Sequence, residues 1–293
     1  MIAFGHSIFA PFLEELPEID NSDLPILKSV QVSEKFNCLT NTRIFDQNQG
    51  RDVLLSSNLS FDKNMPRQEW IFEVNEVVSF YWICGSDTIK FHEDKDGNPI
   101  LTKYWFLHTL LPIYLTIENK FELIHAGSVE IDAQPVLFIG PSYGGKSTLT
   151  DYFIKQNHVM ISDDRVALNE KNSDVLATSS YAYHRPYRKM EDLGLKVPKF
   201  MTHTKKLHMI YVLEQADPTD KVTFTKLKGI ETFKALQYNF DFILPLNKAR
   251  SFELIAKIAS MIPIYRICIP WDIDRLDEVY EKICAHSNNK ENV

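Results

Sequence analysis

Cysteine is scarce and widely spaced in this 293-residue sequence. No two of the four cysteines form a C-x-x-C pair, and the nine histidines show no metal-ligand spacing. This distribution excludes a disulfide framework and a cysteine-based zinc site. Reduced thiols of this kind are typical of a cytosolic setting.

An excess of positive charge is also lacking, with 32 Lys and Arg against 39 Asp and Glu and a formal net charge of −7. Non-specific binding of nucleic acid needs a basic face that displaces counterions, so we expect no nucleic-acid partner. The first residues show no basic segment followed by an apolar one. We therefore expect no signal peptide and a cytoplasmic location.

Long apolar runs are absent as well. The most apolar stretch, residues 104–117, is too short for a membrane span, which needs about 20 apolar residues. We expect no membrane span and a buried helix here, kinked at Pro112 and closed near Asn119, which tolerates a left-handed cap.

The composition, 44% hydrophobic and 24% charged, is that of a soluble globular protein with one large or two smaller domains. Signals are weak over the first 65 residues, and strand patterns then follow at 70–74, 77–83 and 88–92. We predict a β-rich N-terminal portion with a core helix over 1–118. A second domain is expected over 119–286, followed by a disordered polar tail over 287–293.

Residues 140–148 read Gly-Pro-Ser-Tyr-Gly-Gly-Lys-Ser-Thr and match G-x-x-x-x-G-K-[ST], the phosphate-binding loop. The apolar run 135–139 before it predicts a strand, and 148–156 after it predicts a helix. Backbone N–H groups in such a loop face phosphate oxygens at the positive end of the helix. The predicted nucleotide-binding residues are Gly140, Pro141, Ser142, Tyr143, Gly144, Gly145, Lys146, Ser147 and Thr148.

Two side chains of this loop carry the chemistry. We expect Lys146 to reach the β- and γ-phosphates and the Ser147 hydroxyl to hold Mg²⁺, which keeps most of its waters. The loop therefore predicts ATP and Mg²⁺ as the ligands of this chain.

An acidic pair follows the next predicted strand, 157–163. Asp163 comes 17 residues after Lys146, with one short helix between them. This short spacing favours a phosphotransferase over a hydrolase motor. In an extended chain the two neighbours face opposite sides, so one would take a hydroxyl proton and the other would contact the metal or brace the loop. The structural alternative is that Asp163 caps the next segment and Asp164 pairs with Arg165.

The order of these segments resembles a known family. His125-Ala-Gly-Ser, an apolar strand, the loop, a short helix and Ile161-Ser-Asp-Asp-Arg-Val follow one another as in the C-terminal catalytic domain of HPr kinase/phosphorylase. The resemblance covers about residues 121–170 and extends weakly to the C-terminus. It implies an α/β P-loop nucleotide-binding fold akin to phosphoenolpyruvate carboxykinase.

The resemblance also implies roles for individual residues. Asp163 would be the catalytic base that activates the acceptor serine, and Asp164 would assist the metal. His125 matches a family histidine near the site, although an ordinary strand histidine is the alternative. The family usually has glycine near Tyr143, and its later glycine- and glutamate-rich signature is missing here, so we do not expect HPr as the acceptor.

The closer similarity is to HPr-kinase-like proteins of biosynthetic clusters. We predict a kinase that transfers the γ-phosphoryl group of ATP to a hydroxyl, here a serine of a peptide or protein. The alternatives are a kinase of a saccharide or other small molecule and a non-catalytic ATP-sensing module. The family's regulatory enzymes are hexamers, which makes a homo-oligomer one option.

One further segment is a candidate for binding phosphate. Residues 183–189 are basic and aromatic in an otherwise acidic chain. Guanidinium groups bind phosphate bidentately, so this segment could hold the transferred phosphate or an acidic acceptor. We favour the alternative, a solvated loop.

Overall fold

The computed structural model describes residues 1–13, 23–37, 39–48, 50–186 and 189–289. The chain divides into two compact units. The first comprises Met1–Lys120, Arg188–Leu193 and Phe242–Lys248, and the second comprises Phe121–Tyr187, Gly194–Asp241 and Ala249–Val293. Most of the predicted disordered tail, residues 290–293, lies outside the described residues.

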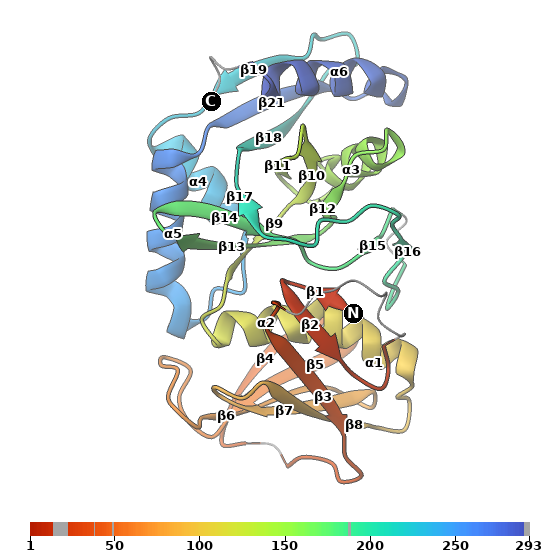
Figure 1. The fold of residues 1–293 in the computed structure, drawn as a ribbon, viewed down its shortest axis with the longest axis vertical. Helices are drawn as coiled ribbons and strands as arrows, with labels where there is room; N and C mark the ends of the chain where they lie inside the picture. Colours follow the sequence, from red (N-terminus) through yellow and green to blue (C-terminus); the bar gives the residue numbers. More distant parts are fainter. Residues whose placement is uncertain (14–22, 38, 49, 187–188, 290–293) are drawn as a thin grey trace. The chain divides into compact units, whose positions relative to one another are not determined.

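The first unit contains an eight-stranded sheet in the order β1-β2-β3-β8-β7-β6-β5-β4 (Figure 1). The strands predicted at 70–74, 77–83 and 88–92 are confirmed as β6, β7 and β8. The first five strands were not predicted, because the sequence pattern is weak there. The strands are β1 (Ile2–Ala3), β2 (His6–Phe9), β3 (Ile26–Gln31), β4 (Asn41–Asn48), β5 (Arg51–Ser57), β6 (Glu69–Val74), β7 (Val78–Ile83) and β8 (Thr88–Glu93).

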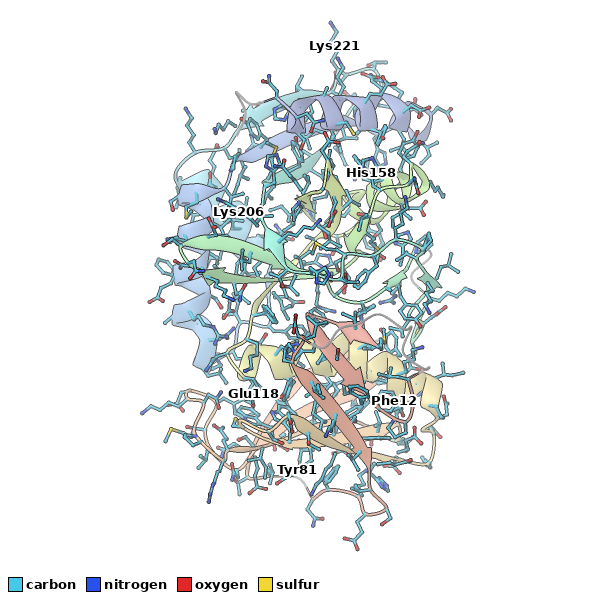
Figure 2. All side chains as sticks on the ribbon, in the orientation of Figure 1. Phe12, Tyr81, Glu118, His158, Lys206 and Lys221 are labelled. Atoms are coloured by element: carbon cyan, nitrogen blue, oxygen red, sulfur yellow. The ribbon has the colours of Figure 1, made fainter. Side chains whose placement is uncertain are left out.

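The predicted buried helix packs on this sheet. It consists of α1 (Pro99–Trp105), a π-helical turn (Phe106–Leu110) and α2 (Leu111–Ile117). Phe12, labelled in Figure 2, joins helix and sheet, with ring centroids 5.0 Å from Phe91 and 5.2 Å from Phe106. The wide turn just before Pro112 relieves the clash of its ring with the preceding carbonyl. Asn119 has a φ of 55°, which confirms the left-handed end of the helix.

The second unit contains two main sheets. One has six strands in the order β12-β10-β11-β18-β21-β19, and the other has five in the order β17-β14-β13-β9-β20. A short hairpin is formed by β15 (Tyr183–His184) and β16 (Leu195–Lys196). The strands of the six-stranded sheet are β10 (Gly127–Ile131), β11 (Gln134–Ile139), β12 (Met160–Ser162), β18 (Met209–Ala216), β19 (Thr223–Lys226) and β21 (Ile264–Pro270). Those of the five-stranded sheet are β9 (Glu122–His125), β13 (Arg165–Lys171), β14 (Asp174–Thr178), β17 (Lys205–Lys206) and β20 (Phe240–Asp241).

Apolar side chains cover both faces of the six-stranded sheet. Along β11, Val136 and Phe138 face a core shared with the helices α3 (Lys146–Lys155) and α6 (Leu276–Ser287). Leu137 and Ile139 face a second core, shared with the five-stranded sheet and the helices α4 (Ile230–Asn239) and α5 (Lys248–Met261). This double burial explains why the run before the loop is apolar at every position.

The alternating pattern of residues 121–131 predicts a single strand, and this prediction is wrong because the chain changes sheets at Ala126. β9 pairs with β13 and β20, whereas β10 pairs with β11 and β12. Gly127 allows the crossing: a Cβ on it would lie 2.2 Å from the Thr150 hydroxyl of α3. Sequence alternation alone does not report which sheet a strand joins.

The sequence pattern also predicts strands near 208–213, 221–225 and 264–269 and helices near 252–261 and 273–285. These elements and the helix predicted at 148–156 are confirmed. The expected strand at 157–163 shortens to β12, and α4 was not predicted. The fold class, α/β with a loop between strand and helix and a β-rich N-terminal portion, is confirmed. No helix in the described part of the chain is both long and apolar enough to cross a membrane.

Candidate phosphate-binding site

The predicted loop and acidic pair lie at one edge of the six-stranded sheet. Strands β11, β18 and β21 are parallel, so their carboxyl ends share this edge. β12 runs in the same direction, because it is antiparallel to β10 and β10 is antiparallel to β11. Residues 140–148 follow β11 and the acidic pair follows β12, at the edge where open α/β sheets bind ligands.

Glycine conformations shape the loop. Gly140 has a φ of 147° and Gly145 a φ of 89°, both in the region that favours glycine. A Cβ on Gly144 would lie 2.9 Å from the Pro141 carbonyl oxygen. Tyr143 has a φ of 62° and is 82% exposed, so the bulky residue at the loop tip is held in a strained conformation.

Lys146 begins helix α3 and is buried. Its Nζ donates to the carbonyl oxygens of Gly140, at 2.8 Å, and Pro141, at 2.9 Å. Pro141 and Ser142 are exposed at the loop tip, Ser147 is half-buried and Thr148 is exposed.

The N-terminus of α3 is suited to an anion. Gly145 is its N-cap, no side chain caps the first turn, and that turn contains no acid. The first N–H groups of a helix lack intrahelical partners, and the helix dipole favours negative charge there. The loop therefore fits a phosphate group.

Asn239 contacts the loop from outside it, and the sequence did not reveal this contact. Its Oδ1 accepts a hydrogen bond from the Gly140 amide at 3.1 Å, and its Nδ2 donates to the Ala235 carbonyl. Asn239 is buried at the end of α4, 99 residues from Gly140. An asparagine at a helix end carries no local signal for such a contact.

The acidic pair lies in a bend between β12 and β13, so the expectation of an extended pair is wrong. Asp164 Oδ1 lies 3.2 Å from His125 Nδ1, and Asp164 Oδ2 lies 2.8 Å from an Arg165 nitrogen. Burial disfavours the charge of Arg165, but Asp164 and Asp241 outweigh it and raise the pKa of the guanidinium. The Asp164–Arg165 pairing is the structural alternative that the sequence left open.

Asp163 is held differently and is buried. Its Oδ2 accepts a hydrogen bond from the Arg185 amide at 2.7 Å and lies 3.1 Å from His184 Nδ1. Its Oδ1 is buried without a hydrogen-bond partner among the described residues. Burying a carboxylate oxygen without a hydrogen bond lowers the stability of the fold. Such atoms are found where a ligand or a proton supplies the missing hydrogen bond.

His184 joins two carboxylates. Its Nε2 is 3.1 Å from Asp151 Oδ1 in α3, and its side chain is 4% exposed. The solvated-loop interpretation of 183–189 is therefore wrong for this residue. Tyr187 and Arg188 of that segment lie outside the described residues.

The charge of His184 predicts a pH-dependent stability. Burial alone would lower the pKa of His184, but Asp163 and Asp151 outweigh it and raise the pKa. A raised native pKa contributes stability fully below the unfolded value of about 6.5 and loses it as the pH rises through the native value. We expect His184→Gln to lower the free energy of unfolding by about 1–3 kcal/mol at pH 6, and by less at pH 9.

Urea unfolding of both proteins between pH 6 and pH 9 measures this difference. Lys155, which pairs with Asp151 at 2.6 Å, provides the control: Lys155→Ala should change stability little at either pH. A difference between wild type and His184→Gln that grows with pH would contradict the assignment of a charged histidine.

The residues present also fit Mg²⁺. In the part of the chain that the structure describes, no group of three or more His, Cys, Asp or Glu side chains could hold a metal ion. Mg²⁺ needs no such cage, since it keeps several waters and takes one or two protein ligands besides phosphate oxygens. The Ser147 hydroxyl and one carboxylate of the acidic pair match that requirement, and the metal-binding roles of Ser147 and Asp164 stay predictions.

Fold and site together define an α/β protein with a phosphate-binding loop and a carboxylate pair at the same sheet edge. No family model matches the chain. The chain is 23% identical over 151 residues to an HPr kinase/phosphorylase of Prosthecochloris aestuarii. This match covers 49% of this chain and 44% of that protein. The chain thus spans less than half the length of the curated relative that it matches.

A solved structure of the HPr(Ser) kinase/phosphatase from Coxiella burnetii is similar to 56% of this chain and 95% of that one, at 16% identity and a TM-score of 0.36. The sequence match confirms the resemblance to HPr kinase/phosphorylases, at the level of a divergent relative.

Proposed function

We propose that this chain is an ATP-dependent kinase that transfers the γ-phosphoryl group to a hydroxyl, namely a serine of a peptide or protein. The observation that carries the proposal is the buried Oδ1 of Asp163, which has no hydrogen-bond partner in the described part of the chain and lies at the sheet edge that bears the phosphate loop. An acceptor hydroxyl beside this oxygen would donate a hydrogen bond to Oδ1 and then transfer its proton to the carboxylate.

The chain's own groups divide the work. The loop amides and Lys146 bind the phosphates of the donor, and the Ser147 hydroxyl would hold Mg²⁺. Bound Mg²⁺ would neutralise charge on the β- and γ-phosphates. Asp163 takes the acceptor proton as the new O–P bond forms and the bond to the leaving ADP breaks. Positioning and charge stabilisation account for most of such catalysis.

The surroundings of Asp163 support its role as a base. The Arg185 amide and His184 contact Oδ2, which holds the carboxylate in orientation, and none of the described residues forms a hydrogen bond with Oδ1. Asp164 is more exposed, but its two carboxylate oxygens already contact His125 and Arg165.

The test is incubation of the full chain with γ-labelled ATP, Mg²⁺ and candidate acceptors encoded beside its gene. Peptides, proteins and saccharides form separate arms. Transfer of label to a serine of a peptide or protein supports the proposal, and transfer to a saccharide assigns the same chemistry to another acceptor. Tight ATP binding without transfer to any acceptor would favour an ATP-sensing module instead.

A further inference from the structure

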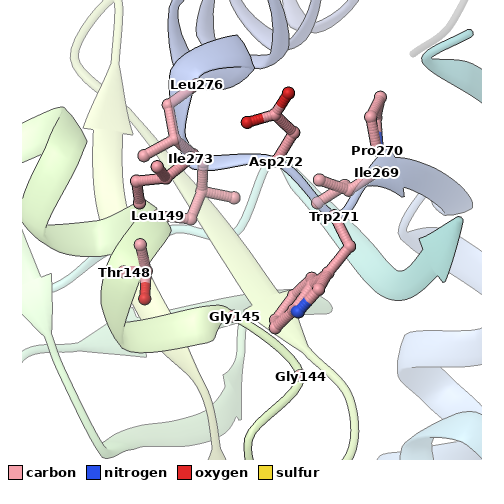
Figure 3. Close-up of a pocket in the computed structure, with 10 residues that line it drawn as sticks. All are labelled: Gly144, Gly145, Thr148, Leu149, Ile269, Pro270, Trp271, Asp272, Ile273 and Leu276. Carbon is pink, nitrogen blue, oxygen red and sulfur yellow. The ribbon is translucent and has the colours of Figure 1, made fainter. Parts of the chain in front are cut away.

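An apolar pocket of about 230 Å³ opens beside the phosphate loop (Figure 3). Gly144, Gly145 and Thr148 form its loop side, so one continuous surface joins the phosphate-binding backbone and the pocket. The opposite wall is the segment after β21, chiefly Trp271 and Ile273.

Trp271 is 50% exposed and Ile273 is 67% exposed, above a floor that includes the buried Leu149 and Ile269. Large apolar side chains exposed at the rim of a pocket mark a ligand site. The Trp271 backbone is anchored, because its amide donates to the Ala216 carbonyl at 3.0 Å. Its ring lies against the loop, since a Cβ on Gly145 would sit 3.3 Å from the ring.

We propose that this pocket binds the base of the nucleotide whose phosphates lie on the loop, with Trp271 as the aromatic contact. The inference rests on the proposed function, because it assumes a nucleotide donor. The pocket is smaller than the roughly 300–1,000 Å³ of sites that enclose whole ligands, so it suits one ring system.

The order of strands decides which end of the nucleotide enters. Asp163 follows β12, two places from β11 on one side, and Trp271 follows β21, two places from β11 on the other. The γ-phosphate must lie toward Asp163 for transfer to occur. The base therefore lies on the β21 side, and the acceptor, which needs Asp163, does not compete for this pocket.

Calorimetric titration of the full chain with ATP and with inorganic tripolyphosphate, each with Mg²⁺, tests the inference without an activity assay. We expect Trp271→Ala to weaken ATP binding roughly 5- to 150-fold, the range for loss of one base–aromatic stack. Tripolyphosphate binding should not change, and Trp271→Phe should retain most of the ATP affinity. Phe252→Ala, an exposed aromatic of α5, is the matched control.

Fluorescence provides a second readout. Trp70, Trp82 and Trp105 are at most 1% exposed, so acrylamide should quench mainly Trp271, and ATP but not tripolyphosphate should protect it. Unchanged ATP affinity in Trp271→Ala, or equal losses for ATP and tripolyphosphate, would overturn the inference while leaving the kinase proposal intact. A wild-type chain that binds neither ligand would overturn both, and the expected Trp271 behaviour without phosphoryl transfer would overturn only the kinase.

Discussion

Asp163→Asn should lower the rate of phosphoryl transfer roughly 10²- to 10⁴-fold, the contribution of a general base in such reactions. The amide keeps the shape of the carboxylate, and its oxygen can still accept the hydrogen bond from the Arg185 amide. Nucleotide affinity should change little, because the phosphates are held by the loop. Single-turnover transfer of label and calorimetric ATP titration separate these two effects.

Asp151→Asn is the matched control for this substitution. Asp151 contacts the other ring nitrogen of His184, so the variant removes the same charge from the same chain of contacts without touching the candidate base. We expect its transfer rate to stay close to that of wild type. Equal losses in the two variants would show that Asp163 acts through His184 and the fold, which contradicts its role as base.

Lys146→Met should weaken binding of both ATP and tripolyphosphate by roughly 10- to 100-fold, as expected for the loss of a charged hydrogen bond. It should also slow transfer by roughly 10²–10³-fold, because the ammonium stabilises charge that develops on the phosphates. Methionine retains an apolar stem for the buried site, so the fold should persist. Calorimetry measures the affinities and label transfer measures the rate.

Lys155→Met, at the other end of α3 and 70% exposed, is the control for the loss of one positive charge from this helix. Its affinities should match wild type. Comparison with the pocket variants separates phosphate binding from base binding. Lys146→Met should weaken the binding of ATP and of tripolyphosphate, whereas Trp271→Ala should weaken only the binding of ATP. Retention of tripolyphosphate binding in Lys146→Met would contradict the assignment of this lysine to the phosphates.

Local patterns in the sequence were enough to predict the strand, loop and helix around residues 140–148. A buried strand, a glycine-rich turn and an amphipathic helix each have a signature within a few residues. The strands of the first unit were missed up to β5, where the signals are weak. The split of 121–131 into β9 and β10 was missed because both strands alternate normally and differ only in the sheet they join.

The candidate site likewise has features that the local sequence predicts and contacts that it does not. Its chemical identity, with Lys146, Ser147 and the acidic pair, follows from residue types and spacing along the chain. The contacts of Asn239 with Gly140, of His184 with Asp163, and of Trp271 with the loop join residues far apart in sequence. Such contacts leave no local trace, so no reading of neighbouring residues could predict them.

The amino-acid sequence alone specified a phosphate-binding loop and a carboxylate pair one helix later, because both depend on short-range spacing. Tertiary structure decided how the pair is used: the bend after β12 turns Asp164 toward His125 and Arg165, and it leaves one buried oxygen of Asp163 without a hydrogen-bond partner among the residues that the structure describes. It also placed an apolar pocket against the loop, since β21 ends at the same sheet edge as β11 through parallel pairing with β18.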